Sequence, residues 1–445
     1  MSARAVRRFE GLDPLRALQR VLYRSAEQDS ERRFHALYDK LTREDVLWAA
    51  WQAVAGNRGA PGVDGVSVDS VADPEGPGVS AFLGGLAGRL RDGSYRPAPL
   101  RRVHIPKVGQ PGKTRPLGIP TVADRVVMAA AKLVLEPVFE ADFLPCSFGF
   151  RPKRSPLDAC EVVRVEANRG RQWVLDADVS DCFGSIDQDV LLGLVARRVS
   201  DRRMLKLIRA WLRAGVLENG VVTDTLSGTP QGSPVSPLLA NIAMHVLDEA
   251  WAGQTGIGKL VRFADDFVVM CASRAQAEQA RRRAAAVLGT LGLRLHPDKT
   301  TIVCLAGGEQ GFDFLGFHHR KVESWKHRGR FYLQRWPKDA AVAAIRAKIR
   351  ERTSPRYVGW PLKDVVGDLN PVLRGWGNYF RNGNSARRFA AVDGYVHERI
   401  AILASRKYGL RGRNWKHRFN TTWFRSLNPR PYQLSGTIRY RSAHA

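Results

Sequence analysis

The sequence predicts an α+β protein built from two or three lobes. At 445 residues, the chain is long enough to bury several sizeable cores. Apolar runs of β-forming residues bracket Asp265 and Asp266, and a similar run begins at Trp173, so the middle of the chain predicts strands. Apolar residues at helical spacing between residues 339 and 380 instead predict helices in the last third.

The segment Leu260–Val269 predicts a β-hairpin with two acids at its tip. Val and Phe favour buried strands and Asp favours turns, so Asp265 and Asp266 should lie exposed at the bend. Asp178, after the other apolar run, adds a third carboxylate, and Mg²⁺ prefers such hard oxygen ligands. Two ions about 4 Å apart can hold the attacking and leaving oxygens of a phosphoryl transfer. The alternatives are a solvated Asp-Asp bend and an Asp178 that only caps a turn.

A Gly- and Pro-dense loop, Gly228–Leu238, leads into an apolar helix expected over Leu238–Leu247. Glycine lets backbone approach a nucleotide closely. Taken in chain order, these segments resemble the reverse transcriptases, and specifically the group II intron reverse transcriptase/maturase family, from Asn57 to about Phe419. The other blocks that carry the resemblance are Asn57–Gly65, Ile105–Lys107, Arg115–Pro120, Ser147–Pro152, Gly292–Thr300 and Phe314–Phe317.

The resemblance implies a right-hand polymerase in which Asp178, Asp265 and Asp266, with the backbone carbonyl of Val179, hold two Mg²⁺ ions for which Mn²⁺ can substitute. Lys299 matches a lysine able to protonate the leaving pyrophosphate; the alternative is an ordinary surface lysine. Phe183 matches the aromatic residue that excludes a ribose 2′-hydroxyl. The residues expected to bind the incoming deoxynucleotide are Lys107, Lys113, Arg115, Phe183, Gln231 and Gly232.

Two positions depart from the family pattern. Phe263 stands where the family usually has Tyr, which removes a hydroxyl but leaves a ring that can pack. Gly184 stands where the family often has Asp, and that acid is not a principal metal ligand. Neither difference predicts an inactive enzyme.

The segment Leu369–Phe380 resembles the maturase signature of group II intron proteins. Its residues Leu369, Leu373, Trp376 and Phe380 fall on one helical stripe, which predicts core packing. A preceding helix is expected over Asp339–Arg352, with Val342, Ile345 and Ile349 on one side. The residues expected to bind RNA are Arg374, Asn378, Arg381, Arg387 and Arg388.

The resemblance divides the chain into an N-terminal extension (1–95), reverse transcriptase fingers and palm (96–325), a thumb or maturase domain (326–405) and a basic C-terminal region (406–445), which is either a reduced DNA-binding region or a frayed end. An exposed loop is expected at Asp69–Ser80 and a turn at His327–Gly329.

Charge agrees with a nucleic acid partner. The chain carries 70 Lys+Arg against 43 Asp+Glu, a net charge of +27, and residues 320–445 hold 28 Lys+Arg and 7 Asp+Glu, a net of +21. Such a field attracts phosphates without sequence preference. Aromatic residues among these arginines, including Trp325, can stack on unpaired bases or pack in the core.

Five scattered cysteines predict reduced thiols and no zinc site, and none follows Cys304, so a Cys/His endonuclease domain is not expected. The sequence predicts neither a signal peptide nor a membrane span, and a prokaryotic cytosolic, nucleoid-associated protein is expected.

The expected function is RNA-directed DNA synthesis on a group II intron RNA, together with help in its splicing and with copying during retrohoming. The expected partners are that RNA, a DNA target or primer and dNTPs. The oligomeric state is left open. Two alternatives stand beside this function: a domesticated enzyme of repair or phage defence, and an RNA-binding splicing cofactor with secondary polymerase activity.

Overall fold

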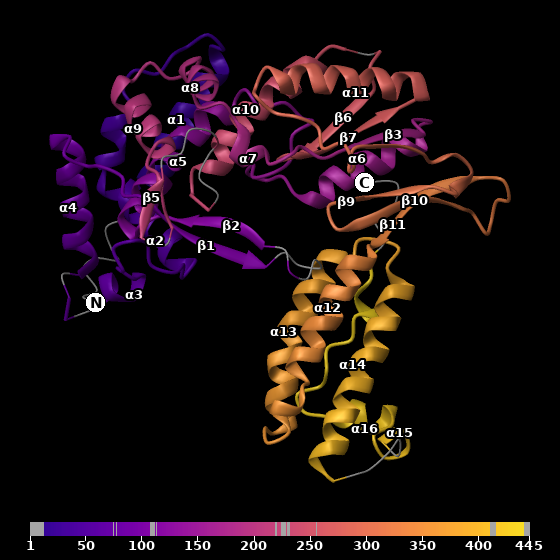
Figure 1. Ribbon diagram of the computed structural model, residues 1–445. Helices are drawn as coiled ribbons and strands as arrows, with labels where there is room; N and C mark the ends of the chain where they lie inside the picture. The colour runs from indigo at the N-terminus through magenta and orange to yellow at the C-terminus, as the bar shows by residue number, and fades with distance from the viewer. Residues whose placement is uncertain are drawn as a thin grey trace. The chain divides into compact units, whose positions relative to one another are not determined.

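The computed structural model describes residues 13–73, 75–76, 78–106, 112, 114–218, 220–223, 228, 232–254, 256–409 and 415–439. The chain divides into two compact units (Figure 1). Of the described residues, the first unit comprises those within 13–106, 112–159 and 175–302, and the second comprises those within 160–174 and 303–439. The predicted boundary between residues 325 and 326 lies at the end of a β-hairpin within the second unit.

The first unit is rich in helices packed around α5 (Val122–Glu140), which is buried along most of its length and contacts α1 and α2. Its other helices and helical turns are α1 (Pro14–Gln28), η2 (Tyr38–Thr42), α2 (Glu44–Gly56), α3 (Val68–Ala72), α4 (Gly78–Asp92), α7 (Cys182–Ser185), α8 (Gln188–Ala196), α9 (Arg202–Leu212), α10 (Ser236–Trp251) and α11 (Arg274–Gly289). Helix α6 (Pro156–Asn168) runs from this unit into the second.

The loop expected at Asp69–Ser80 is wrong at both ends. Its first residues belong to α3, and α4 begins at Gly78. Ser67 and Ser70 form a reciprocal capping box, and Val68 and Val71 are buried, so a short helix is favoured despite the Pro and Gly residues that follow.

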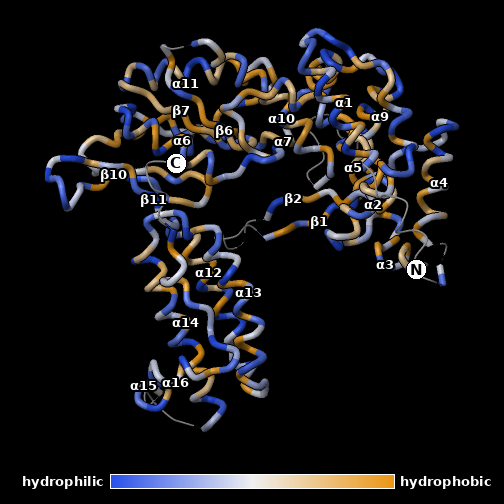
Figure 2. Tube along the Cα trace, turned by 180° about the vertical axis from the view of Figure 1, so that it is seen from behind, coloured by the Kyte–Doolittle hydropathy of each residue, from blue (hydrophilic) through white to orange (hydrophobic). Residues whose placement is uncertain are grey.

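Two four-stranded sheets accompany these helices. One has the order β2-β1-β4-β5, formed by Thr114–Ile119, Leu100–Pro106, Val216–Glu218 and Val221–Thr223. The other has the order β6-β7-β3-β8, formed by Lys259–Phe263, Asp266–Cys271, Trp173–Ala177 and Thr301–Cys304. Strands β6 and β7 are hydrophobic and largely buried (Figure 2), which places a rigid strand pair beneath the predicted acidic turn.

The second unit combines a three-stranded sheet with helices. Its sheet has the order β11-β10-β9, formed by Phe331–Pro337, Phe317–Glu323 and Gly311–Phe314. The helices and helical turns are η3 (Ala306–Gly308), α12 (Asp339–Arg352), η4 (Pro355–Tyr357), α13 (Leu362–Phe380), α14 (Ala386–Lys407), α15 (Trp415–Arg418), α16 (Thr421–Ser426) and η5 (Ser435–Thr437). Helices α12, α13 and α14 pack side by side (Figure 1).

The predicted helical faces are confirmed in this unit. Helix α12 has the predicted bounds and buries Val342, Ile345 and Ile349. Helix α13 buries Leu369, Leu373 and Phe380. Trp376 is half-buried, and its ring packs 4.8 Å from that of Phe380 and 5.5 Å from that of Phe389, measured between centroids. The stripe is therefore core.

Three of the five cysteines, Cys160, Cys182 and Cys271, are buried. Within the described part of the chain, none of the helices has the length and apolar character needed to cross a bilayer.

Candidate active site

The predicted hairpin is confirmed, but Asp266 belongs to strand β7 rather than to the turn, and the exposure of both acids differs from the prediction. Strands β6 and β7 pair antiparallel, and the last pair joins Phe263 to Asp266, so the turn consists of Ala264 and Asp265. Two-residue hairpin turns require positive φ, and Ala264 has a φ of 59°. Both acids are half-buried rather than exposed. The constrained backbone of this two-residue turn therefore gives the Asp265 side chain a defined direction.

Asp178 is held beside this hairpin by backbone pairing on its own segment. It follows β3, which lies next to β7 in the sheet. The carbonyl of Asp178 accepts a hydrogen bond of 2.8 Å from the backbone N–H of His296, and Val179 forms an isolated β-bridge with Leu295. The segment before Lys299 therefore fixes the backbone of Asp178 and Val179.

The carboxylates of Asp178 and Asp265 are close enough to repel each other. Burial raises the pKa of Asp265, and the negative charge of Asp178 raises this pKa further. The Nζ of Lys299 lies 3.0 Å from Oδ2 of Asp178. Lys299 is thus an ion-pair partner of a predicted catalytic acid and not an isolated surface lysine.

These oxygens suit a divalent cation without forming a complete ligand set. Across the residues that the structure describes, no group of three or more His, Cys, Asp or Glu side chains is placed to hold a metal. Asp178 and Asp265 are the acids brought together, and Asp266 is the first residue of β7. Mg²⁺ is commonly held by one or two carboxylates together with substrate phosphates and water, so the pair fits such an ion.

A fully buried arginine, Arg262, supports the hairpin through hydrogen bonds to Asp248 and to the turn, and the sequence analysis did not predict it. We call this set of contacts the brace. Arg262 and Asp248 are both 0% exposed, and the guanidinium donates two hydrogen bonds, of 2.8 and 2.5 Å, to the carboxylate. Arg262 also donates to the Oδ1 of Asn241, the Oγ of Ser147 and, at 2.7 Å, the carbonyl of Ala264. The Coulombic attraction of Arg262 opposes the effect of burial, and the net result lowers the pKa of Asp248. The hydrogen bond from Arg262 to the carbonyl of Ala264 fixes the turn that carries Asp265.

The Ser147–Pro152 block, assigned only by resemblance, supports the same turn. The backbone N–H of Phe148 donates to the carbonyl of Arg262 at 2.9 Å. A Cβ on Gly149 would clash with the backbone nitrogen of Ala264, so only glycine fits there. The ring of Phe263 lies 6.4 Å from that of Phe150, so the residue that replaces the usual Tyr does pack.

The candidate gate Phe183 lies in α7 and is half-buried. A Cβ on Gly228 would lie 2.5 Å from the carbonyl oxygen of Phe183, so the Gly/Pro loop touches the backbone of the gate. A Cβ on Gly184 would clash with the carboxylate of Asp181. An acid at position 184 would therefore require the Asp181 side chain to move.

Of the predicted nucleotide-binding residues, Arg115 lies exposed on β2 opposite Ile105. A Cβ on Gly232 would lie 2.8 Å from the carbonyl oxygen of Gly118 on the same strand, so the loop bearing Gly232 meets that strand. Lys107, Lys113 and Gln231 lie outside the described residues.

The predicted RNA-binding residues lie in the second unit and differ in exposure and in ion pairing. Arg374, Asn378 and Arg387 are exposed, and the guanidinium of Arg374 lies 5.5 Å from the ring centroid of Tyr432. Arg381 is half-buried after α13. Arg388 forms an ion pair of 2.6 Å with Asp339.

Two family models match consecutive parts of the chain. Residues 105–319 match the reverse transcriptase (RNA-dependent DNA polymerase) family, and residues 342–423 match the group II intron maturase-specific domain. The first match covers both site acids, Asp178 and Asp265, and it defines the class of enzyme as an RNA-directed DNA polymerase, a family that conventionally uses a divalent metal.

Similar curated proteins narrow this class. Protein YkfC of Escherichia coli K12 is 33% identical over 353 residues, which cover 70% of this chain and 89% of YkfC. The group II intron-encoded protein LtrA of Lactococcus lactis is 36% identical over 239 residues, 54% of this chain, and the chain spans only 39% of the length of LtrA. The chain belongs to the group II intron reverse transcriptase/maturase family. A chain of the partial Cas6-RT-Cas1–Cas2 complex is similar over 57% of this chain and 41% of its own length, with 24% identity and a TM-score of 0.35.

Proposed function

We propose that this protein copies a group II intron RNA into DNA by two-metal-ion nucleotidyl transfer and assists the splicing of that RNA. The observation that carries the proposal is the convergence of Asp178 and Asp265 at a braced hairpin turn, in a chain that also matches a maturase domain. The same proposal gives the chain fingers, palm and thumb, with the boundaries expected from the sequence, and a cytosolic location.

Asp178 and Asp265 would hold two Mg²⁺ ions, or Mn²⁺ in their place, with the carbonyl of Val179 and the carboxylate of Asp266 as further oxygen donors. Bound there, the ions supply charge stabilisation at the attacking and leaving oxygens. The raised pKa of Asp265 supports this assignment, because a buried carboxylate beside a second negative charge is stabilised by a cation.

The surrounding residues orient the substrates. Arg115, with Lys107 and Lys113, binds the triphosphate of a deoxynucleotide, while Gln231 and Gly232 seat its sugar and base. Phe183 occupies the space below C2′, so a deoxyribose fits more easily than a ribose. The contact between Gly228 and the backbone of Phe183 supports a shared nucleotide pocket.

Lys299 is placed to move a proton. The primer 3′-hydroxyl gives its proton to solvent water, and its oxygen forms a bond to the α-phosphorus. The bond from that phosphorus to the pyrophosphate oxygen breaks, and the leaving pyrophosphate takes a proton from the Lys299 ammonium. The 3.0 Å ion pair with Asp178 supports the role, because it places the Lys299 ammonium beside a predicted metal ligand.

The test is extension of a DNA primer on an RNA template with Mg²⁺. Asp178→Asn and Asp265→Asn should each reduce the rate by roughly two orders of magnitude or more, since each removes one of the converging charges. Asp189→Asn is the matched control, because the side chain of Asp189 is 74% exposed and lies outside the site. A rate above about a tenth of wild type in either site variant contradicts the assignment.

Binding of intron RNA separates the alternatives. A protein that serves an intron should bind its cognate RNA more tightly than an RNA of equal length and shuffled sequence, whereas a domesticated polymerase of repair or defence should extend primers without that preference. A splicing cofactor with idle chemistry should bind RNA but fail to extend.

A further inference from the structure

The β10–β11 hairpin of the second unit extends past the third strand of its sheet. Strands β10 and β11 pair over seven positions, from Phe317–Pro337 to Glu323–Phe331. Strand β9 pairs only with Phe317–Arg320, so the rest of the hairpin is a two-stranded ribbon (Figure 1). An isolated ribbon is marginally stable, so its base needs support.

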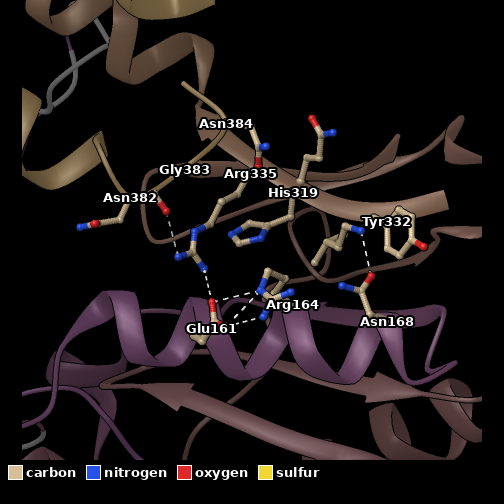
Figure 3. Close-up of a pocket in the computed structure, with 11 residues that line it drawn as sticks. Glu161, Arg164, Asn168, His319, Tyr332, Arg335, Asn382, Gly383 and Asn384 are labelled. Atoms are coloured by element: carbon tan, nitrogen blue, oxygen red, sulfur yellow. Dashed lines mark hydrogen bonds and ion pairs between the residues drawn. The ribbon is translucent and has the colours of Figure 1, made fainter. Parts of the chain in front are cut away.

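A polar network fixes that base (Figure 3). Arg335 on β11 pairs with Glu161 at 3.5 Å and donates to the carbonyl of Asn382 at 3.1 Å. The backbone N–H of Leu333 donates to Oδ1 of Asn168 at 3.0 Å. These groups line a cavity of about 270 Å³. Leu333 and Arg335 therefore anchor β11 at the base of the hairpin, and the loop between the strands extends from this anchored base.

That loop, Ser324–Arg330, carries an aromatic ring among cations. Trp325 is 87% exposed, and the Nζ of Lys326 lies 5.0 Å from its ring centroid. Lys326, His327, Arg328 and Arg330 are all exposed. The acid next to the loop, Glu323, accepts a hydrogen bond of 2.7 Å from the backbone N–H of Gly329, which shapes the turn.

This arrangement is unsuited to a purely structural turn. Turns favour Gly, Asn, Asp and Ser, and a large exposed indole contributes nothing to a core. Exposed aliphatic neighbours, which an apolar protein interface requires, do not accompany Trp325 within residues 324–330. An exposed ring in a loop that also carries the exposed cations Lys326, Arg328 and Arg330 suits an unpaired strand, which offers bases and phosphates in alternation.

We propose that the β10–β11 loop binds an unpaired nucleotide strand, with Trp325 stacking on a base and Lys326, Arg328 and Arg330 contacting phosphates. The inference rests on the proposed function insofar as it takes nucleic acid as the partner, and it adds a site that lies in the second unit, outside the catalytic hairpin. A duplex offers its phosphates to the same cations, but its bases are already stacked and unavailable to the ring.

The test measures affinity by fluorescence anisotropy for a 12-nucleotide RNA, a DNA of the same sequence, and a blunt-ended RNA duplex formed by the same RNA and its complement. Loss of one base–aromatic stack corresponds to roughly a 5- to 150-fold change in affinity. Trp325→Ala should therefore weaken single-strand binding about tenfold, leave duplex binding within about twofold, and be rescued by Trp325→Tyr. Binding of the strand should quench the fluorescence of Trp325 in the wild-type protein. This quenching should be smaller in Trp325→Tyr, because that variant binds the strand but lacks the indole.

Trp360→Ala is the matched control, since Trp360 is 51% exposed in the same unit and lies beyond η4, outside the β10–β11 loop. Replacing Lys326, Arg328 and Arg330 together with Gln should lower the slope of log affinity against log salt by about two for the single strand. A similar loss in the RNA and DNA arms indicates a general strand site, and a loss in one arm alone identifies that strand as the ligand.

Single-strand binding by Trp325→Ala within twofold of wild type would overturn the proposal, as would an equal loss in Trp360→Ala or on the duplex. Primer extension by the wild-type protein is measured in the same preparation. Failure of wild-type extension counts against the proposed function, whereas unchanged strand binding by Trp325→Ala beside normal wild-type extension counts against the loop site alone.

Discussion

The β6–β7 and β10–β11 hairpins place their loops by opposite means. The β6–β7 turn has two residues and is held from inside by Arg262, which is 0% exposed and bonds the carbonyl of Ala264. The β10–β11 loop is anchored only at its base and ends in Trp325, which is 87% exposed. Chemistry needs one fixed carboxylate direction, whereas strand recognition needs an accessible ring and charge.

The largest expected effect comes from breaking the internal brace. Arg262→Met leaves the carboxylate of Asp248 buried without its partner, which should lower the free energy of unfolding by about 3–5 kcal/mol. The turn also loses its bond to Arg262, so primer extension should fall. Urea denaturation followed by circular dichroism measures the first effect.

Arg197→Met is the control for this brace, because the ion pair of Arg197 with Glu249 is exposed and should contribute no more than about 1 kcal/mol. The double variant Arg262→Met with Asp248→Leu should recover much of the lost stability without recovering synthesis. Equal destabilisation by the two single Arg variants would show that the buried pair is no brace.

The second prediction concerns the base of the exposed hairpin. His319 on β10 is 0% exposed, and burial lowers the pKa of its imidazole to about 3. In the unfolded chain His319 has an ordinary pKa near 6.5, so between about pH 6.5 and 3 it is protonated when unfolded and neutral when folded. The free energy of unfolding should therefore fall as pH decreases from about 6.5 towards 3. The slope should approach about 1.4 kcal/mol per pH unit from this residue.

His319→Phe should flatten that dependence, because it removes the titrating group and keeps a ring against Phe312, which stacks 5.1 Å from the imidazole. His327→Asn, in the exposed loop, should leave the pH profile unchanged. Unfolding free energies of the three proteins at pH 6.5, 5.5 and 4.5 decide the matter. A His319→Phe profile parallel to that of wild type contradicts the assignment.

Sequence patterns predicted the parts of both regions that depend on local order. The β6–β7 hairpin with Asp265 in its turn, the bounds of α12 and the buried stripe of α13 follow from alternation, turn preference and helical spacing. The brace could not be predicted in this way, because Arg262, Asp248 and Asn241 are brought together only by packing of α10 on the sheet. The signal that could have found it was a charged residue within an apolar strand, since a buried charge requires a partner.

A third prediction tests whether the β6–β7 turn requires the close approach of the Gly149 backbone to that of Ala264. Gly149→Ala places a Cβ against the backbone nitrogen of Ala264 and should cost about 1–3 kcal/mol of stability, with a primer-extension rate lowered about tenfold. Gly193→Ala, on α8 with nothing within 4 Å of the added Cβ, should not destabilise the fold. Equal behaviour of the two variants would mean that the turn can move without consequence.

The smallest expected effects lie on the charged surface of the second unit, where single contacts contribute little and act through salt. Arg374 and Arg387 are exposed, whereas Arg388 is paired with Asp339 at 2.6 Å, so the three arginines should not contribute equally to RNA binding. Replacing Arg374 and Arg387 with Gln should lower the slope of log affinity against log salt by about two, roughly one for each lost phosphate contact. Arg388→Gln should change the slope less, because its guanidinium already has a carboxylate partner.

Asp265→Asn should abolish synthesis and leave RNA affinity and its salt dependence intact, since the braced turn serves chemistry and the basic surface serves binding. Intron RNA affinity measured at four salt concentrations for these variants tests the whole comparison. If Asp265→Asn loses RNA affinity, or if the double Arg variant keeps the wild-type slope, the two regions do not divide the work in this way.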